Sequence, residues 1–107
     1  PTSFAPVTAE AKAAAEAVAA KKSNMDLHNA AAWENIFTLK KIIEEQKIMG
    51  KPETVAADRQ KMRQGLAALK QTQGLLGPVE RAADREAIKP FLFVQAKGGA
   101  WTVAHKP

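Results

Sequence analysis

Apolar residues recur with a helical period over the first two thirds of the chain. This spacing predicts three helices, at about residues 9–22, 27–49 and 55–71. The first is almost entirely alanine, the residue that favours helix most, and Thr8 before it is a suitable N-cap. Its only large apolar residue is Val18. We therefore expect this helix to pack closely against a neighbour or not at all.

The second predicted helix is apolar around more than half of its circumference. At about 100° per residue, two adjacent faces carry its large apolar side chains: Ile36, Leu39 and Ile43 on one, and Trp33, Phe37 and Ile48 on the other. Asp26 or Asn29 can cap its start, and Gly50 is suited to its C-terminal cap. A helix that is apolar over so wide an arc needs contacts on two sides.

The third predicted helix follows Pro52 and has Thr54 as its N-cap. Asp58 lies in the first turn of this helix, where a negative charge interacts favourably with the helix dipole. Its apolar residues lie on one face at helical spacing: Val55, Met62, Leu66 and Leu69. Before the first predicted helix, we expect residues 1–7 to form an extended lead-in.

The last third of the chain has the short apolar runs and turn residues that are typical of strands. We expect strands at about residues 78–82, 90–97 and 100–105, with residues 83–87 as a polar connection. Gly98-Gly99 has the composition of a two-residue hairpin turn. The predicted fold is α+β, with three helices followed by a three-stranded antiparallel meander, in a single partial domain over residues 1–107.

The composition makes the hydrophobic core small for the length of the chain. Of 107 residues, 22 are alanine and only 27 are larger apolar residues. Because burial of apolar area stabilises a fold by ~25 cal/mol per Å², so few large side chains give a modest contribution. We expect the apolar faces to be covered by a second copy or by a part of the protein outside this chain.

No residues have the arrangement that catalysis or metal binding requires. The chain has no cysteine, and its two histidines, His28 and His105, lie far apart in sequence. Glu44 and Glu45 are adjacent, so on a helix they point in different directions and do not form a catalytic pair. We therefore expect no enzyme, no metal site and no cofactor, and the sequence assigns no ligand-binding residue.

The net charge of +5 leaves open a small basic nucleic-acid-associated protein as an alternative. Two basic groups occur, Lys40-Lys41-Lys47-Lys51 and Arg59-Lys61-Arg63-Lys70. Glu44, Glu45, Glu53 and Asp58 alternate with them at ion-pair spacing, which is typical of a solvated helix surface, so we expect no nucleic-acid partner. A helical interaction module is a further alternative. No apolar run approaches the ~20 residues that span a bilayer, so we expect no membrane insertion.

From Ala30 to Pro107 a series of short motifs follows a familiar order. They are Ala31-Ala32-Trp33-Glu34-Asn35, the helix from Ala57-Asp58-Arg59 to Leu69, Gly74-Leu75-Leu76-Gly77-Pro78-Val79, Lys89-Pro90 with Phe91-Leu92-Phe93-Val94-Gln95, Gly98-Gly99, and Trp101-Thr102-Val103. In this order and spacing the chain resembles the C-terminal third of periplasmic substrate-binding proteins of branched-chain-amino-acid-type ABC transporters, which have the type I fold. It departs from the family pattern at Trp33, at Arg81–Ala87, which lacks the usual glycine, and at Ala100.

The resemblance implies part of a two-lobed periplasmic receptor that closes around amino acids or aromatic carboxylates and docks to a membrane permease. Most of the ligand-contacting loops and the parallel sheets of such a receptor are absent, so we expect little or no specific affinity from this chain alone. His28, Asn29 and Trp33 are where it would approach the parent's cleft, although no family motif fixes them. For the chain itself we expect a homodimer in which helices 29–49 pack across the interface, with exchange of elements as one form.

Overall fold

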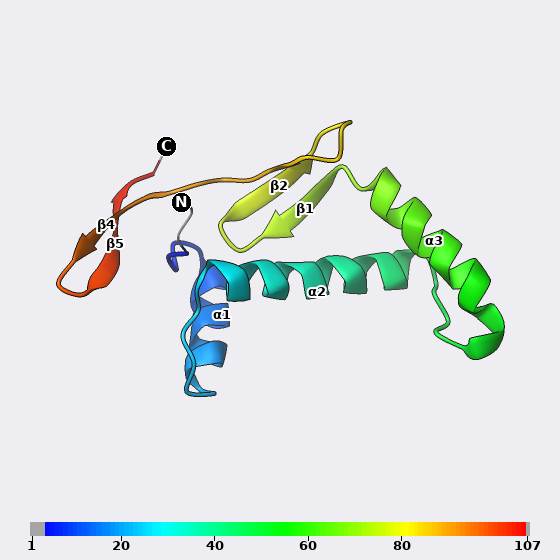
Figure 1. Ribbon diagram of the computed structural model, residues 1–107, viewed down its shortest axis with the longest axis horizontal. Helices are drawn as coiled ribbons and strands as arrows, with labels where there is room; N and C mark the ends of the chain where they lie inside the picture. The colour runs from blue at the N-terminus through cyan, green and yellow to red at the C-terminus, as the bar shows by residue number, and fades with distance from the viewer. Residues whose placement is uncertain (1–3, 107) are drawn as a thin grey trace.

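The protein is α+β, as the sequence predicts, and its helices and sheets are spread along an extended body (Figure 1). The computed structural model describes residues 4–106, so the first three residues of the predicted lead-in and Pro107 lie outside the described residues. Over this range there are three α-helices, a three-stranded antiparallel sheet and a separate two-stranded hairpin.

Helix α1 (Ala9–Ala19) begins where the sequence predicts. The Thr8 hydroxyl oxygen accepts a hydrogen bond from the Ala11 backbone N–H at 3.0 Å, which caps the helix. The same hydroxyl donates to the Leu75 backbone carbonyl and so ties the start of α1 to a turn 67 residues further along the chain. Ala11 and Ala14 are buried, so the alanine-rich helix does pack closely.

Helix α2 (Leu27–Glu45) also begins at its predicted cap, where Asp26 accepts from the Asn29 backbone N–H at 2.8 Å. The predicted end at residue 49 is wrong by four residues. Lys47 takes a left-handed conformation with φ 52°, and the Ile48 N–H donates to the Ile43 carbonyl, which is a Schellman cap. A lysine, and not Gly50, therefore ends this helix. Helix α1 ends at Ala19, three residues before the predicted end at residue 22, and the turn after it has the same kind of cap, with Lys22 at φ 59°.

Helix α3 (Val55–Ala68) follows a short 3-10 turn, η1 (Pro52–Thr54). Thr54 occupies the predicted N-cap position, but its side chain makes no capping bond to the helix backbone and donates instead to the Asp58 carboxylate at 2.7 Å. The predicted end of this helix at residue 71 is wrong, because residues 71–74 form a strand.

The first sheet contains β1 (Gln71–Gly74), β2 (Gly77–Arg81) and β3 (Ala87–Ile88) in that order, all antiparallel. Only β2 corresponds to a predicted strand. A tight turn at Leu75-Leu76 joins β1 to β2, with Gly74 paired to Gly77 across it. The short β3 pairs with the end of β2. Its first residue, Ala87, lies in the predicted polar connection, and Ile88 lies just beyond it.

The second sheet is the hairpin of β4 (Phe93–Lys97) and β5 (Ala100–His105). Gly98 and Gly99 have φ of 59° and 77°, as a two-residue hairpin turn requires. The predicted single meander is wrong, because this hairpin is separate from β1-β2-β3. The strand begins at Phe93 and not at residue 90, because its partner strand β5 ends at His105, which pairs with Phe93. Pro90 in addition has no N–H to donate to a ladder.

The hydrophobic core is small and lies where α1, the start of α2 and the β1-β2 turn meet. Its buried members are Ala11, Ala14, Ala30 and Leu75, with Phe4, Met25 and Trp33 packed against them. The radius of gyration is 16.5 Å, against about 13 Å for a compact domain of this length. The chain is therefore far more extended than a self-contained globule, as its extents of 55 × 34 × 20 Å also show.

Candidate functional site

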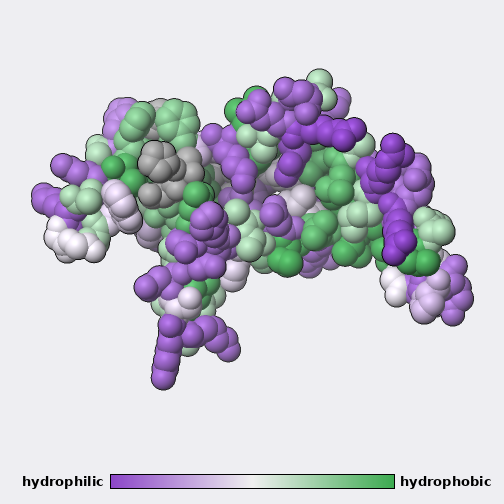
Figure 2. Space-filling view, in the orientation of Figure 1, coloured by the Kyte–Doolittle hydropathy of each residue, from purple (hydrophilic) through white to green (hydrophobic). Residues whose placement is uncertain are grey.

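Helix α2 is covered on one side only. Ala30 and Ile42 are buried on the side that faces the first sheet and α3. On the outer side Ile36 is 65 % exposed, Leu39 37 % and Ile43 42 %. Hydrophobic residues accordingly show on the molecular surface along the middle of the body (Figure 2). The two-sided contact predicted for this helix is not made within residues 4–106.

A groove of about 530 Å³ lies between the end of α1 and this outer face of α2. Its lining residues come from both helices and the loop between them: Val18, Ser23, Asn29, Ala32, Trp33, Ile36 and Phe37. The rings of Trp33 and Phe37 are 5.8 Å apart and tilted by 39°. Of the three residues expected near a cleft, Asn29 and Trp33 line the groove, whereas His28 does not and is exposed.

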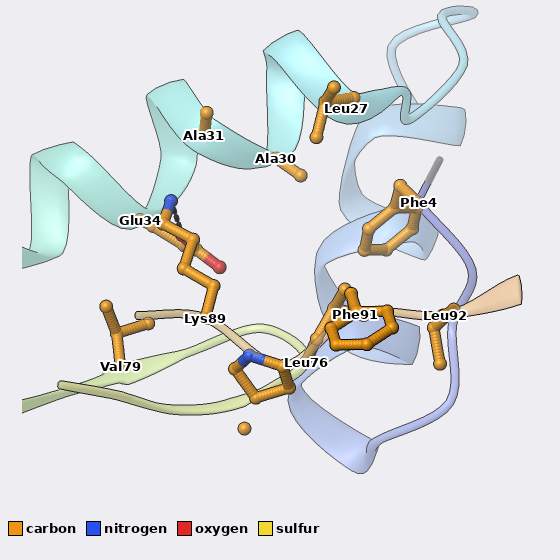
Figure 3. Close-up of a pocket in the computed structure, with 12 residues that line it drawn as sticks. Phe4, Leu27, Ala30, Ala31, Glu34, Leu76, Val79, Lys89, Phe91 and Leu92 are labelled. Atoms are coloured by element: carbon orange, nitrogen blue, oxygen red, sulfur yellow. Dashed lines mark hydrogen bonds and ion pairs between the residues drawn. The ribbon is translucent and has the colours of Figure 1, made fainter. Parts of the chain in front are cut away.

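A smaller pocket of about 130 Å³ lies on the inner side of α2, where the helix meets the β1-β2 turn and the link to β4 (Figure 3). Its walls are mostly apolar and include Phe4, Leu27, Val79 and Phe91. A cavity of this size holds one small apolar ring at most.

Glu34 is the polar anchor of that pocket. One of its carboxylate oxygens accepts from the Leu75 backbone N–H at 2.8 Å, and the other pairs with the Lys89 Nζ at 3.3 Å (Figure 3). A single side chain of α2 thus holds both the β1-β2 turn and the chain after β3. Lys89, which lines the pocket, is thus paired with the Glu34 carboxylate.

Asp58 is a second anchoring carboxylate, and it lies at the connection between α2 and α3. It is 7 % exposed and accepts from the Met49 and Gly50 backbone N–H groups at 3.3 and 2.9 Å, as well as from Thr54. The Thr54 hydrogen bond, helped by those of Gly50 and Met49 and by the charge of Lys61, lowers the pKa of Asp58 although burial opposes the shift. The three groups that donate to Asp58 all lie in the segment that joins α2 to α3, so Asp58 holds that segment in its conformation.

The first of the two basic groups is partly neutralised on the surface of α2. Lys40 pairs with Glu44 at 2.7 Å and Lys41 with Glu45 at 3.8 Å, which confirms the predicted ion-pair spacing. Within residues 4–106, His, Cys, Asp and Glu side chains form no group of three that is placed to hold a metal ion. No helix in the same range is both long and apolar enough to cross a bilayer.

Sequence reasoning missed Glu34 as an anchor. The available signal was a carboxylate in the middle of an apolar helix, on the same side as Ala30 and Ile42. Its partner Leu75 lies 41 residues away, so only the tertiary fold brings the two together.

The chain was compared with family models, curated proteins and solved structures, and none of them matches it.

Proposed function

We propose that this chain is part of an extracytoplasmic solute-binding protein of an ABC-type importer. The observation that carries the proposal is the uncovered outer face of α2, which lies within the segment that resembles the C-terminal part of such receptors. A helix that is covered on one side and apolar on the other has the character of a layer that belongs between two neighbours.

The area of the molecular surface supports this interpretation. The accessible surface is 8013 Å², whereas a compact protein of the same mass exposes about 5,800 Å². The excess of about 2,200 Å² exceeds what one partner buries in a standard interface, about 800 Å². This excess supports a large covering body as the neighbour of the chain.

In the proposed receptor, two lobes close around an amino acid or an aromatic carboxylate in the periplasm, and the closed form docks to a membrane permease. The isolated chain lacks the second half of the clamp. Its inner pocket is small and the lysine that lines it is paired with Glu34, which supports little or no affinity of the isolated chain for a free carboxylate.

Two measurements test the proposal. Sequencing of the surrounding coding region should reveal an in-register two-lobe sequence or a neighbouring permease, and unrelated flanking genes would contradict the assignment. Titration calorimetry of the 107-residue chain with branched-chain and aromatic carboxylates should give no saturable heat. A micromolar response would refute the proposed loss of affinity.

For the chain on its own, we propose a homodimer in which the α2 helices pack across the interface. A second copy then covers part of the apolar surface that the larger receptor would otherwise cover. Sedimentation analysis that found a folded monomer at micromolar concentration would contradict this pairing.

A further inference from the structure

The outer face of α2 carries a regular series of positions. Successive members are spaced by three and four residues in turn, the repeat that places side chains along one seam of a coiled coil. The series is Asn29, Ala32, Ile36, Leu39, Ile43 and Gln46. All are exposed except Gln46, which is half-buried. We call these six residues the α2 seam.

The α2 seam is suited to meeting a copy of itself. It contains no charged residue, so two chains of net charge +5 can approach along it without like charges in contact. Its four central members are apolar, and its two ends are amides. The Asn29 side chain already donates to the Asn24 backbone carbonyl at 2.9 Å, and its amide oxygen can accept from the partner's Gln46.

We infer that two copies of the chain pack antiparallel along the α2 seam; this rests on the proposed homodimer and names its surface and register. Ile36 lies opposite the partner's Leu39, and Ala32 opposite the partner's Ile43. Asn29 then lies opposite the partner's Gln46. Because the two helices are related by a two-fold axis, each of these layers occurs twice.

Three features favour this direction over the parallel one. Antiparallel packing places the small Ala32 against a large residue, whereas parallel packing would place two alanines together and leave a void. The helix dipoles attract when they are antiparallel. Next to the seam, Trp33 comes to face the partner's Lys40, a pair that cation–π attraction stabilises.

The groove beside α2 provides room for the second helix. Asn29, Ala32 and Ile36 of the seam are among the residues that line its 530 Å³, and Val18 of α1 forms part of the opposite wall. The C-terminal half of the partner's α2 would occupy this space. The excess surface of about 2,200 Å² leaves ample area for the ~800 Å² per chain that a standard interface buries.

The first experiment is sedimentation velocity over a concentration series of the 107-residue chain. We expect a dimer whose dissociation constant rises by about 100-fold or more when Ile36→Glu and Ile43→Lys are combined, because two apolar side chains are lost from the interface. Ile88→Glu is the matched control: Ile88 is 57 % exposed but lies on β3, so the dimer should persist. Circular dichroism checks that each variant is folded.

The second experiment tests the register with conservative variants and exploits the absence of native cysteine. Ala32→Cys and Ile43→Cys proteins are mixed, oxidised and identified by mass spectrometry. The antiparallel register predicts mixed disulfide dimers and few dimers of Ala32→Cys with itself, since a disulfide needs Cα atoms within about 7 Å. This result stands even if the charged double variant fails to fold.

Each contrary result overturns a different statement. A wild-type monomer would overturn the homodimer and the seam together, and would leave the remainder of a receptor as the occupant of this face. A dimer that survives Ile36→Glu with Ile43→Lys would overturn the seam alone. Dimers of one cysteine variant with itself differ in mass from mixed dimers, and abundant dimers of Ala32→Cys with itself would overturn the antiparallel register.

Discussion

Gly65 of α3 lies directly against Ile42 of α2, and both residues are buried. A Cβ atom placed on Gly65 would be only 2.5 Å from Cγ2 of Ile42, closer than real Cβ contacts come. The missing side chain therefore lets the two helices approach at this point. The side chain of Gln46 is also close to Gly65, since the Cγ atom of Gln46 would be 3.3 Å from the same Cβ position.

Replacement Gly65→Ala should destabilise the protein by up to about 2 kcal/mol. Overpacking costs about 1–3 kcal/mol, and the better helix propensity of alanine offsets about 1 kcal/mol of that. Urea denaturation measures the difference, with the exposed neighbour Gln64→Ala as control. The cost of Gly65→Ala should shrink in an Ile42→Ala background, and an unchanged cost would show that this contact is not its cause.

Replacement Asp58→Asn should lower the melting temperature, because an amide cannot accept all three hydrogen bonds that the carboxylate accepts from Met49, Gly50 and Thr54. Thermal denaturation at neutral pH measures the effect. Glu53→Gln, on the exposed turn η1, is the matched control and should change the melting temperature little. Equal melting temperatures for wild type and Asp58→Asn would argue against this anchor.

The Asp58 contribution should also depend on pH. Its pKa is lowered in the folded protein, so the folded state binds the proton less well than the unfolded state does. The stabilisation is therefore complete well above the ordinary Asp pKa of about 3.9 and is lost as the pH falls below it towards the folded value. Denaturation between pH 7 and pH 3 should show the gap between wild type and Asp58→Asn narrowing in acid. A gap that widens in acid would contradict the direction of the shift.

Glu34 offers a comparison of two substitutions. Glu34→Gln keeps an oxygen that can accept from the Leu75 N–H and loses only the partly exposed pair with Lys89, so it should cost less than about 1 kcal/mol. Glu34→Ala leaves the backbone N–H of the buried Leu75 without its acceptor and should cost about 1–3 kcal/mol. Chemical denaturation of both variants separates the two contributions, and equal costs would show that the backbone bond contributes little.

The starts of the helices could be predicted from the sequence, and their ends could not. Thr8 and Asp26 are polar caps whose side chains bond to their own helix, so the signal is local. The ends of α1 and α2 depend on left-handed Lys22 and Lys47, a conformation that residue type alone assigns to glycine.

The missed elements share a different cause. Strand β1 has little apolar alternation of its own and exists through its pairing with β2. The outer face of α2 could be predicted, since periodicity is a property of the sequence. The anchoring role of Glu34 could not, because its partners lie 41 and 55 residues away.

The β4-β5 hairpin should be the least protected sheet of the described chain. A two-stranded hairpin alone is marginally stable in water, and this one lies apart from the other elements (Figure 1), with Trp101 64 % exposed. The β1-β2 pair, in contrast, is held to α2 by Glu34. Hydrogen exchange followed by mass spectrometry should therefore show faster exchange in residues 93–105 than in residues 71–81. The α2 seam does not include the hairpin, so dimer formation should leave this order unchanged. Equal protection of the two segments would mean that another surface covers the hairpin.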